Sequence, residues 1–287
     1  MKSSVQLNAK IRNLAKATGI NAGILHRNFM LERFLERITV SKYQKNFILK
    51  GGVLIASIVG IDTRSTMDLD TTIKGQRLTE DEIIRIVGEI LSIHLDDSVE
   101  FTLKRIEETL KEADYCGYRV TLEIMFDQSR DVLKIDITTG DAITPQAIEY
   151  GYKLMFGDKT INIMAYNLET ILAEKFETVI SRSVTNTRMK DFYDIFILTS
   201  GRNIKFDPRV FAEALKNTSN QRHTQNNLVD ADRVIDAIAS NPDMAKLWKR
   251  YQADNPYVAD IAFEAVTTVL RKLSVYITDG YNNYEVN

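Results

Sequence analysis

Hydrophobic and polar positions divide this sequence into a first half in which helical and strand-like segments alternate and a second half that is mostly helical. Apolar residues recur at helical spacing in residues 5–17 and 21–37, with a break at Gly19, which predicts two helices. Strand-like patterning follows in residues 47–49, 118–126, 132–138 and 159–164.

Helical patterning also occurs between and after these strands. An apolar helix-like run covers residues 53–59, and Thr79 looks like the cap of a helix that continues to Leu91. A helix begins near Asn167, and helical segments then cover residues 171–180, 192–198, 208–215, 228–239 and 261–273. The pattern therefore predicts an α+β fold with a mixed-sheet domain at residues 1–165 and a helical domain at residues 166–287.

The turn after the first predicted strand is a candidate phosphate site. Gly51 and Gly52 end this strand and open the apolar helix. Glycine allows a close approach of backbone to ligand, and the first N–H groups of a helix are unpaired and favour anions. We expect this turn, with Lys50 beside it, to hold a triphosphate.

The next predicted strand carries a pair of aspartates. Asp68 and Asp70 alternate with the apolar Met67 and Leu69, and residues two apart in a strand point to the same face. Two carboxylates on one face can bind a hard cation such as Mg²⁺. A phosphate-binding turn followed by a carboxylate pair indicates metal-assisted nucleotidyl transfer.

A third carboxylate is expected from a neighbouring strand. Asp136 lies on the polar face of the strand predicted at residues 132–138, which makes it a candidate metal ligand or general base. Glu123 and Asp127 are competitors for this place, and Asp136 could also be an ordinary surface residue. The sequence leaves this choice open.

The helical half contains one lysine in an unusual position. Lys175 falls inside an apolar stripe, where a lysine either extends its amine to water or meets a buried anion. If it only covers apolar surface, Lys175→Met is expected to be neutral or stabilising. Asp191 could cap the helix that follows, and Asp194 could pair with a nearby cation.

Composition excludes several classes of protein. The longest apolar runs fall short of a membrane span, and the first residues lack the apolar core of a signal peptide, so a cytoplasmic protein without a membrane partner is expected. The chain has one cysteine, Cys116, and three histidines. Intramolecular disulfides and cysteine-based zinc sites are therefore excluded, and a histidine-rich metal site is not expected.

Charge is unevenly distributed along the chain. The net charge is −2, but residues 1–50 contain ten Lys and Arg against two Glu, which gives +8 for this segment and −10 for the rest. Such a segment could face a polyanion, or it could form the solvated faces of two helices.

Five motifs together resemble the AbiEii/AbiGii toxin family, the nucleotidyltransferase toxins of AbiE abortive-infection and MenT-type toxin–antitoxin systems. These motifs are LKGG, RSTMDLD, LKIDIT, NLETILAEKFE and RMKDFYDIF, between Phe47 and Leu198. The resemblance implies a polymerase-β-like nucleotidyltransferase core with a helical C-terminal domain. It also implies phage defence through growth inhibition when the antitoxin is absent.

The resemblance further implies ligands and partners. The cofactor would be Mg²⁺ and the donor a nucleoside triphosphate (GTP, CTP or UTP). The acceptor would be an RNA, with the 3′ end of tRNA as in MenT-type members. The cognate antitoxin would be encoded nearby and is expected to form no stable complex with the toxin.

Several residues match the family's motifs by position. Thr66 and Asp68 match a hydroxyl–x–Asp pair and Asp70 the second aspartate, while Lys175 matches an essential lysine that neutralises charge during transfer. Asp191 and Asp194 match a D-x-x-D motif, with Asp191 as the expected essential member. The predicted site thus comprises catalytic Asp68, Asp70, Asp136, Lys175 and Asp191, nucleotide-binding Lys50, Gly51, Gly52, Thr66 and Asp194, and metal-binding Asp68, Asp70 and Asp136.

Two other functions fit the same residues. One is nucleotidyl transfer to a small molecule, as in antibiotic-modifying enzymes. The other is a nucleotide-binding module that is not catalytic and acts by sequestering a partner. Mg²⁺-dependent release of pyrophosphate would separate the enzymes from the binding module.

Overall fold

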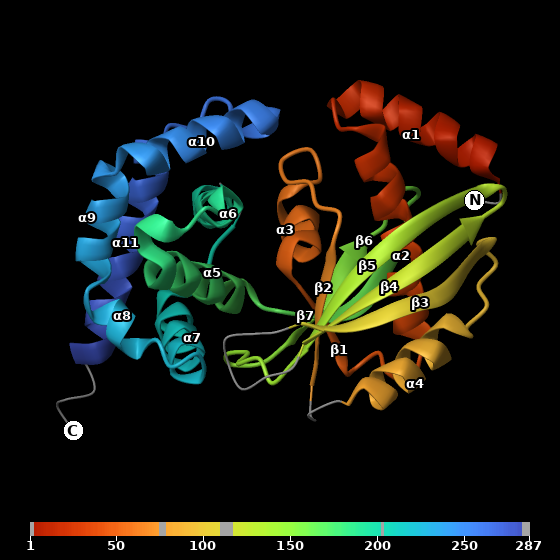
Figure 1. The fold of residues 1–287 in the computed structure, drawn as a ribbon, viewed down its shortest axis with the longest axis horizontal. Coiled ribbons are helices and arrows are strands. Elements are labelled where there is room, and N and C mark those ends of the chain that lie inside the picture. The colour runs from red at the N-terminus through yellow and green to blue at the C-terminus, as the bar shows by residue number, and fades with distance from the viewer. Residues whose placement is uncertain (1–2, 75–78, 110–116, 202–203, 283–287) are drawn as a thin grey trace. The chain divides into compact units, whose positions relative to one another are not determined.

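The computed structural model describes residues 3–74, 79–109, 117–201 and 204–282, and the chain divides into two compact units (Figure 1). Unit 1 comprises Met1–Asp141 and Ala147–Ala165, and unit 2 comprises Ala142–Gln146 and Tyr166–Asn287. None of the helices in the described part of the chain combines the length and the apolar character that a membrane crossing requires.

Unit 1 is built on a mixed β-sheet. Among the described residues, seven strands form this sheet in the order β3-β4-β5-β2-β1-β7-β6. The pairs β2–β5 and β1–β7 are parallel and the other neighbours are antiparallel, which confirms the predicted α+β class with a mixed sheet. The strands are β1 (Phe47–Lys50), β2 (Leu69–Ile73), β3 (Val99–Thr109), β4 (Gly117–Phe126), β5 (Ser129–Thr139), β6 (Ile148–Lys153) and β7 (Thr160–Ala165).

Helices cover the two faces of this sheet unequally. α2 and α4 pack on one face, and the short α3 lies against β1 and β2 on the other (Figure 1). A capping box between Thr79 and Glu82 begins α4, as the sequence predicts, and Gly19 ends α1 in a left-handed conformation. The helices are α1 (Ser4–Thr18), α2 (Ala22–Val40), α3 (Gly51–Val59) and α4 (Glu80–Leu91).

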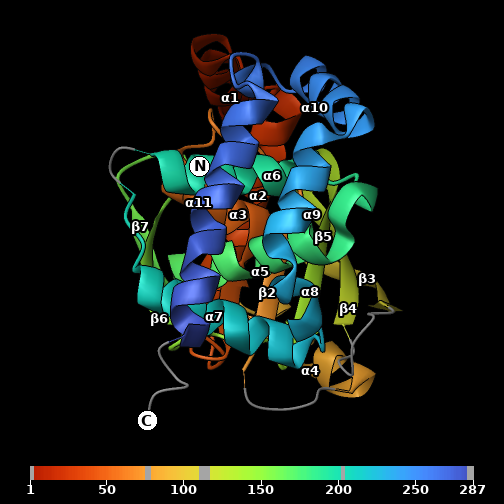
Figure 2. The same ribbon diagram turned by 90° about the vertical axis from the view of Figure 1, so that its left-hand side faces the viewer.

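Unit 2 is helical in its described residues. α5 packs against α6 and α7, and the long α11 runs beside α6, α7 and α9 (Figure 2). Trp248 is fully buried, and its indole nitrogen donates to the Ile261 carbonyl at 2.8 Å. The α-helices are α5 (Leu168–Arg182), α6 (Met189–Ser200), α7 (Pro208–Gln221), α8 (Gln225–Val229), α9 (Ala231–Ser240), α10 (Pro242–Asp254) and α11 (Phe263–Asn282), with 3₁₀ turns η1 (Ser183–Thr185) and η2 (Pro256–Val258).

The sequence did not predict three elements that the structure contains: β3, β6 and α10. In β3 only Val99 and Phe101 are buried, and a β-bulge between Leu103 and Arg105 shifts the strand's alternation, so the period of two is lost. β6 is an edge strand with little burial, and α10 buries only Met244 and Trp248. Weak burial leaves little hydrophobic pattern to detect.

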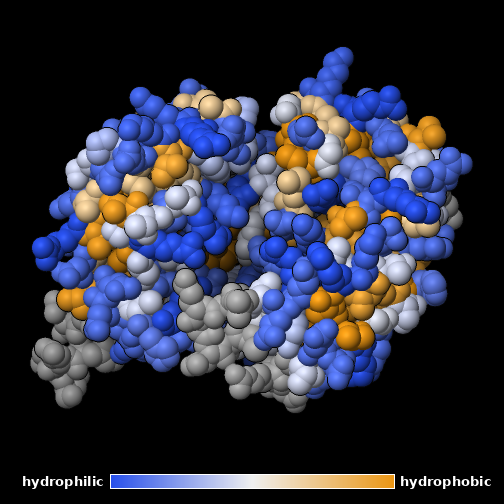
Figure 3. Space-filling model, in the orientation of Figure 1, coloured by the Kyte–Doolittle hydropathy of each residue, from blue (hydrophilic) through white to orange (hydrophobic). Residues whose placement is uncertain are grey.

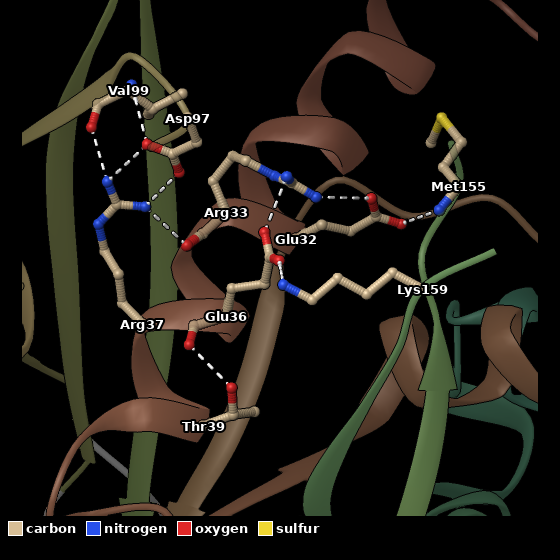
Figure 4. Close-up of polar contacts among 9 residues, drawn as sticks. All are labelled: Glu32, Arg33, Glu36, Arg37, Thr39, Asp97, Val99, Met155 and Lys159. Atoms are coloured by element: carbon tan, nitrogen blue, oxygen red, sulfur yellow. Dashed lines mark hydrogen bonds and ion pairs between the residues drawn. The ribbon is translucent and has the colours of Figure 1, made fainter. Parts of the chain in front are cut away.

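Charged side chains on α2 are buried among one another (Figure 4). Arg37 donates to both oxygens of Asp97, at 2.7 and 3.1 Å, and to the Val99 carbonyl at 2.7 Å. Glu36 pairs with Arg33 at 2.8 Å and with Lys159 at 2.6 Å. These contacts fasten α2 to the start of β3 and to the β6–β7 hairpin.

Hydrophobic side chains on the surface are scattered. Figure 3 shows separate hydrophobic areas interrupted by hydrophilic ones on the face in view. The exposed large hydrophobic residues lie on different elements, among them Val5, Met67, Met125, Val229 and Val275.

Glu32 provides a test of the cluster on α2. Burial raises its pKa from 4.5 to about 8, although the Met155 amide donates to its Oε1 at 2.8 Å. Between these pH values the folded state holds a proton that the unfolded state releases, so the free energy of unfolding falls as pH rises, by about 1.4 kcal/mol per unit. We expect Glu32→Gln, which keeps the acceptor oxygen, to flatten this decline and to raise the melting temperature at pH 8.

Thermal melting between pH 5 and 9 measures the effect. Glu149→Gln, on the exposed edge strand β6, serves as the matched control and is expected to follow the wild type. Parallel pH profiles for the wild type and Glu32→Gln would contradict the assignment.

Candidate active site

A row of charged side chains crosses one face of the sheet in unit 1. Lys50 on β1 lies opposite Asp70 on β2, Asp70 opposite Asp136 on β5, and Asp136 opposite Arg119 on β4. Residues directly opposite in neighbouring strands share a face, with strands about 4.8 Å apart. The row therefore reads cation, carboxylate, carboxylate, cation across four adjacent strands, which we call the charged row.

The glycine pair packs directly against this row. Gly51 has a φ of +66°, and a Cβ placed there would lie 2.1 Å from Oδ2 of Asp70. A Cβ on Gly52 would lie 2.7 Å from the Thr66 hydroxyl. The turn between β1 and α3 therefore requires glycine twice, because Asp70 and Thr66 occupy the space of both missing side chains.

Asp68 lies just outside the strand that was predicted to contain it. β2 begins at Leu69, and Asp68 is exposed immediately before it. The preceding segment is anchored to α2, because the Asn28 side chain donates to the Thr66 carbonyl at 3.0 Å. Thr66 and Asp70, on either side of Asp68, pack against the first turn of α3, where unpaired N–H groups favour an anion.

Asp136 is held by an arginine that the sequence did not single out. Arg119 donates from Nε and Nη2 to the two oxygens of Asp136, each at 2.7 Å. These hydrogen bonds and the carboxylate charge raise the pKa of Arg119 above its ordinary value. The alternation of polar and apolar residues in β4 places Arg119 on the polar face. This alternation was the feature of the sequence that could have indicated Arg119 as a site residue.

The competitors of Asp136 have other partners. Glu123 pairs with Lys104 at 3.4 Å. Asp127 accepts hydrogen bonds from the Ser4 hydroxyl and amide, which lower its pKa. Asp136 is the member of the three that lies directly opposite Asp70.

Whether Asp136 can bind a divalent cation depends on its pairing with Arg119. In the described part of the chain, no group of three or more His, Cys, Asp or Glu residues is placed to hold a metal ion. Asp68 and Asp70 still fit the usual mode of Mg²⁺, which takes one or two carboxylates and completes its shell with substrate phosphates and water. Asp136 would first have to release Arg119.

Lys50 is engaged by an acidic residue of the same unit. Its Nζ lies 2.5 Å from Oδ2 of Asp141, which also accepts from the Thr138 hydroxyl at 2.5 Å. The side chain of Lys50 is 12% exposed. Its charge at the edge of the row is therefore largely compensated.

In unit 2 the buried lysine meets two carboxylates. Nζ of Lys175 on α5 lies 2.8 Å from Asp191 and 2.7 Å from Asp194, both on α6. Burial alone would lower the pKa of Lys175, but the two carboxylates outweigh it and raise the pKa. Burial likewise opposes ionisation of Asp191, and the charges of Lys175 and Arg188 nonetheless lower its pKa.

The predicted site residues thus form one group within each unit. In unit 1 the structure brings together Lys50, Gly51, Gly52, Thr66, Asp70 and Asp136, with Asp68 at the end of the same segment. In unit 2 it brings together Lys175, Asp191 and Asp194.

The two carboxylates reverse the expectation for Lys175→Met. Removing the lysine deprives two buried carboxylates of the cation that they share and leaves Asp191 with Arg188 at 3.1 Å; breaking a buried ion pair typically costs about 3–5 kcal/mol. We therefore expect a lower melting temperature at pH 7. The loss should shrink towards pH 4, because the uncompensated carboxyl groups then become neutral.

Thermal melting of Lys175→Met at the two pH values measures this effect. Lys205→Met, which removes an exposed lysine of the same unit, serves as the control and should change little. A Lys175→Met protein that melts with the wild type at pH 7 would contradict the pairing.

Comparisons with known proteins bear on the family and the fold of the chain. The sequence model of a family described as "Nucleotidyl transferase AbiEii toxin, Type IV TA system" matches residues 33–270. Among curated proteins no significant match is found. JHP933 from Helicobacter pylori has a similar fold, with a TM-score of 0.51 at 14% identity over 93% of this chain and 97% of that chain.

A second solved structure, of a candidate nucleotidyltransferase from H. pylori, has a TM-score of 0.49 at 16% identity over 93% of this chain and 98% of that chain. The family match spans most of the sequence and includes both groups of site residues. The chain therefore belongs to the AbiEii family, the nucleotidyl transferase toxins of type IV toxin–antitoxin systems.

Proposed function

We propose that this toxin transfers a nucleoside monophosphate from a nucleoside triphosphate to an RNA, with the 3′ end of tRNA as the expected acceptor and Mg²⁺ as the cofactor. The observation that carries the proposal is the packing of Asp70 and Thr66 against Gly51 and Gly52 at one end of the charged row. It joins a carboxylate, a hydroxyl and the first turn of a helix, the groups that a metal-bound triphosphate requires.

The candidate site residues of unit 1 have distinct proposed roles. The first N–H groups of α3 hold the triphosphate, and Thr66 donates its hydroxyl to a phosphate oxygen. Asp68 and Asp70 hold Mg²⁺, which supplies compensation for the charge that develops on the phosphate oxygens. Lys50, at the end of the row and paired with Asp141, is proposed to contact the triphosphate beside the glycine turn.

Lys175 is proposed to supply a further positive charge to the reaction, as the family resemblance implies. Its two carboxylate partners fix the position of the amine and keep it protonated at neutral pH. Asp191 and Asp194 are then positioning residues. Transfer measured on the same Lys175→Met sample that is used for melting separates a catalytic from a structural contribution.

Within the basic N-terminal segment, we select α1 as the candidate RNA contact. Arg33 and Arg37 are buried in ion pairs on α2, while Lys42 pairs with Glu89 at 2.6 Å and Lys50 with Asp141. The cations of α1 are exposed and have no acidic partner among the described residues; they are Lys10, Arg12 and Lys16. We propose that α1 contacts phosphates of the acceptor.

Biological context follows from the same proposal. Nucleoside triphosphates, Mg²⁺ and tRNA meet in the cytoplasm, where loss of functional tRNA would inhibit growth and could defend against phage. The cognate antitoxin would oppose this activity without forming a stable complex.

The aspartates of unit 1 give the first test of the function. Asp68→Asn and Asp70→Asn keep the size of the side chain and remove the charge that a cation needs, so each should abolish Mg²⁺-dependent transfer from α-labelled NTP to RNA while the protein still folds. Asp158→Asn, on the exposed β6–β7 hairpin, is the control and should retain transfer. A folded Asp70→Asn protein with normal transfer and toxicity would contradict the active-site assignment.

The charge of α1 gives a second test. Neutralising Lys10, Arg12 and Lys16 to Gln should weaken RNA binding and flatten its dependence on salt, by about 0.7 in the slope of log K against log salt for each lost contact with a single strand. Lys42→Gln, whose partner is Glu89, is the control from the same segment. An unaltered slope in the triple variant would return α1 to an ordinary solvated helix.

A further inference from the structure

A second row of side chains lies beside the charged row on the same face of the sheet. Thr121 follows Arg119 by two residues on β4, and it lies directly opposite Arg105 on β3 and Lys134 on β5. Residues two apart in a strand share a face, so Arg105, Thr121 and Lys134 form a row parallel to the one that contains Arg119 and Asp136. Arg119 and Lys134 are diagonal neighbours on adjacent strands, and such positions are typically about 7–8 Å apart.

The hydroxyl group in this row has no protein partner. Thr121 is 7% exposed, and its Oγ1 is buried without a hydrogen bond to any described residue. A buried hydroxyl without a partner costs free energy. The three cations around it are Arg105, Arg119 and Lys134, which makes an anion with oxygen acceptors the complementary ligand.

The charges nearby leave two of these cations available. Arg119 is 41% exposed and uses Nε and Nη2 on Asp136, while its Nη1 makes no hydrogen bond within the described residues. Lys134 is exposed, and no acidic side chain in the described part of the chain pairs with it. Arg105 pairs with Glu107 at 2.9 Å, Glu123 pairs with Lys104, and the charge of Asp68 also acts on Arg119.

The order of the strands places this group on the acceptor side of the aspartates. The glycine turn lies on the β1 side of Asp70, whereas Asp136, Arg119 and Lys134 lie on the β5 and β4 side. An attacking and a leaving oxygen stand roughly in line on opposite sides of the transferred phosphorus. With the triphosphate at the glycine turn, the acceptor approaches from the β4–β5 side.

We propose that Arg119 and Lys134, with the Thr121 hydroxyl between them, bind a backbone phosphate of the acceptor RNA next to its reacting end, an inference that rests on the proposed transfer to RNA. Asp136 is then a positioning residue that fixes the guanidinium of Arg119, and the free edge of this arginine faces the ligand.

Binding of a fluorescently labelled single-stranded RNA without a triphosphate, in EDTA and at several salt concentrations, tests the proposal. Arg119→Gln and Lys134→Gln should each weaken binding about fivefold at 0.1 M salt, and the double variant should reduce the salt slope by about 1.4. Thr121→Val should weaken binding about fivefold with an unchanged slope, because a neutral hydroxyl releases no counterion. Lys153→Gln, which removes an exposed lysine from edge strand β6, is the control. It should change the affinity and the salt slope only as far as the loss of one distant charge does.

Two results would overturn the assignment. One is wild-type affinity and slope in folded Lys134→Gln and Thr121→Val proteins, which carry the test even if Arg119→Gln fails to fold. The other is a double variant that loses affinity for an NTP in EDTA but not for RNA, which would assign the phosphate to the donor. Transfer by the wild-type protein is measured separately, so a failure of RNA transfer and a failure of this binding surface are distinguishable.

Discussion

Two carboxylates directly opposite each other on neighbouring parallel strands, Asp70 and Asp136, are the constraint on which the site in unit 1 depends. Like charges so placed destabilise a sheet unless cations compensate them. Arg119 donates to both oxygens of Asp136, and on the far side of Asp70 lies Lys50, whose amine is itself paired with Asp141. Asp70 itself reaches over Gly51, which explains why the turn into α3 has no side chain there. The row thus stays folded without substrate and still presents negative charge beside a helix N-terminus.

The same principle governs the buried lysine of unit 2. Two carboxylates one turn apart on α6 surround the amine of Lys175, so three charges are buried together and none of them is isolated. Such a group holds its protonation state over a wide range of pH, because the lysine pKa is raised and that of Asp191 is lowered. The role proposed for Lys175 in transfer depends on this fixed and protonated amine.

The sequence predicted the elements that bury regular apolar stripes, and it predicted the polar faces of β2 and β5. It could not predict β3, because a bulge breaks its alternation, or α10, because only two of its side chains are buried. Asp136 was visible as a polar-face residue, but its partner was not, since the pairing of Arg119 with it depends on strand register. The basic N-terminal segment suggested a large polyanion surface, whereas Arg33 is paired with Glu36 on the same helix and Arg37 forms a tertiary ion pair with Asp97. Register and tertiary pairing are long-range properties, which local patterns do not encode.

The central claim is that a metal-bound triphosphate is held at the glycine end of the charged row. Crystals grown with a non-hydrolysable NTP and Mn²⁺ would locate the cation directly by its anomalous scattering. The account predicts a peak about 2.1 Å from carboxylate oxygens of Asp68 and Asp70, with phosphates at the start of α3 and Asp136 still bound to Arg119. A nucleotide bound elsewhere, or a cation bound away from both aspartates, would contradict it.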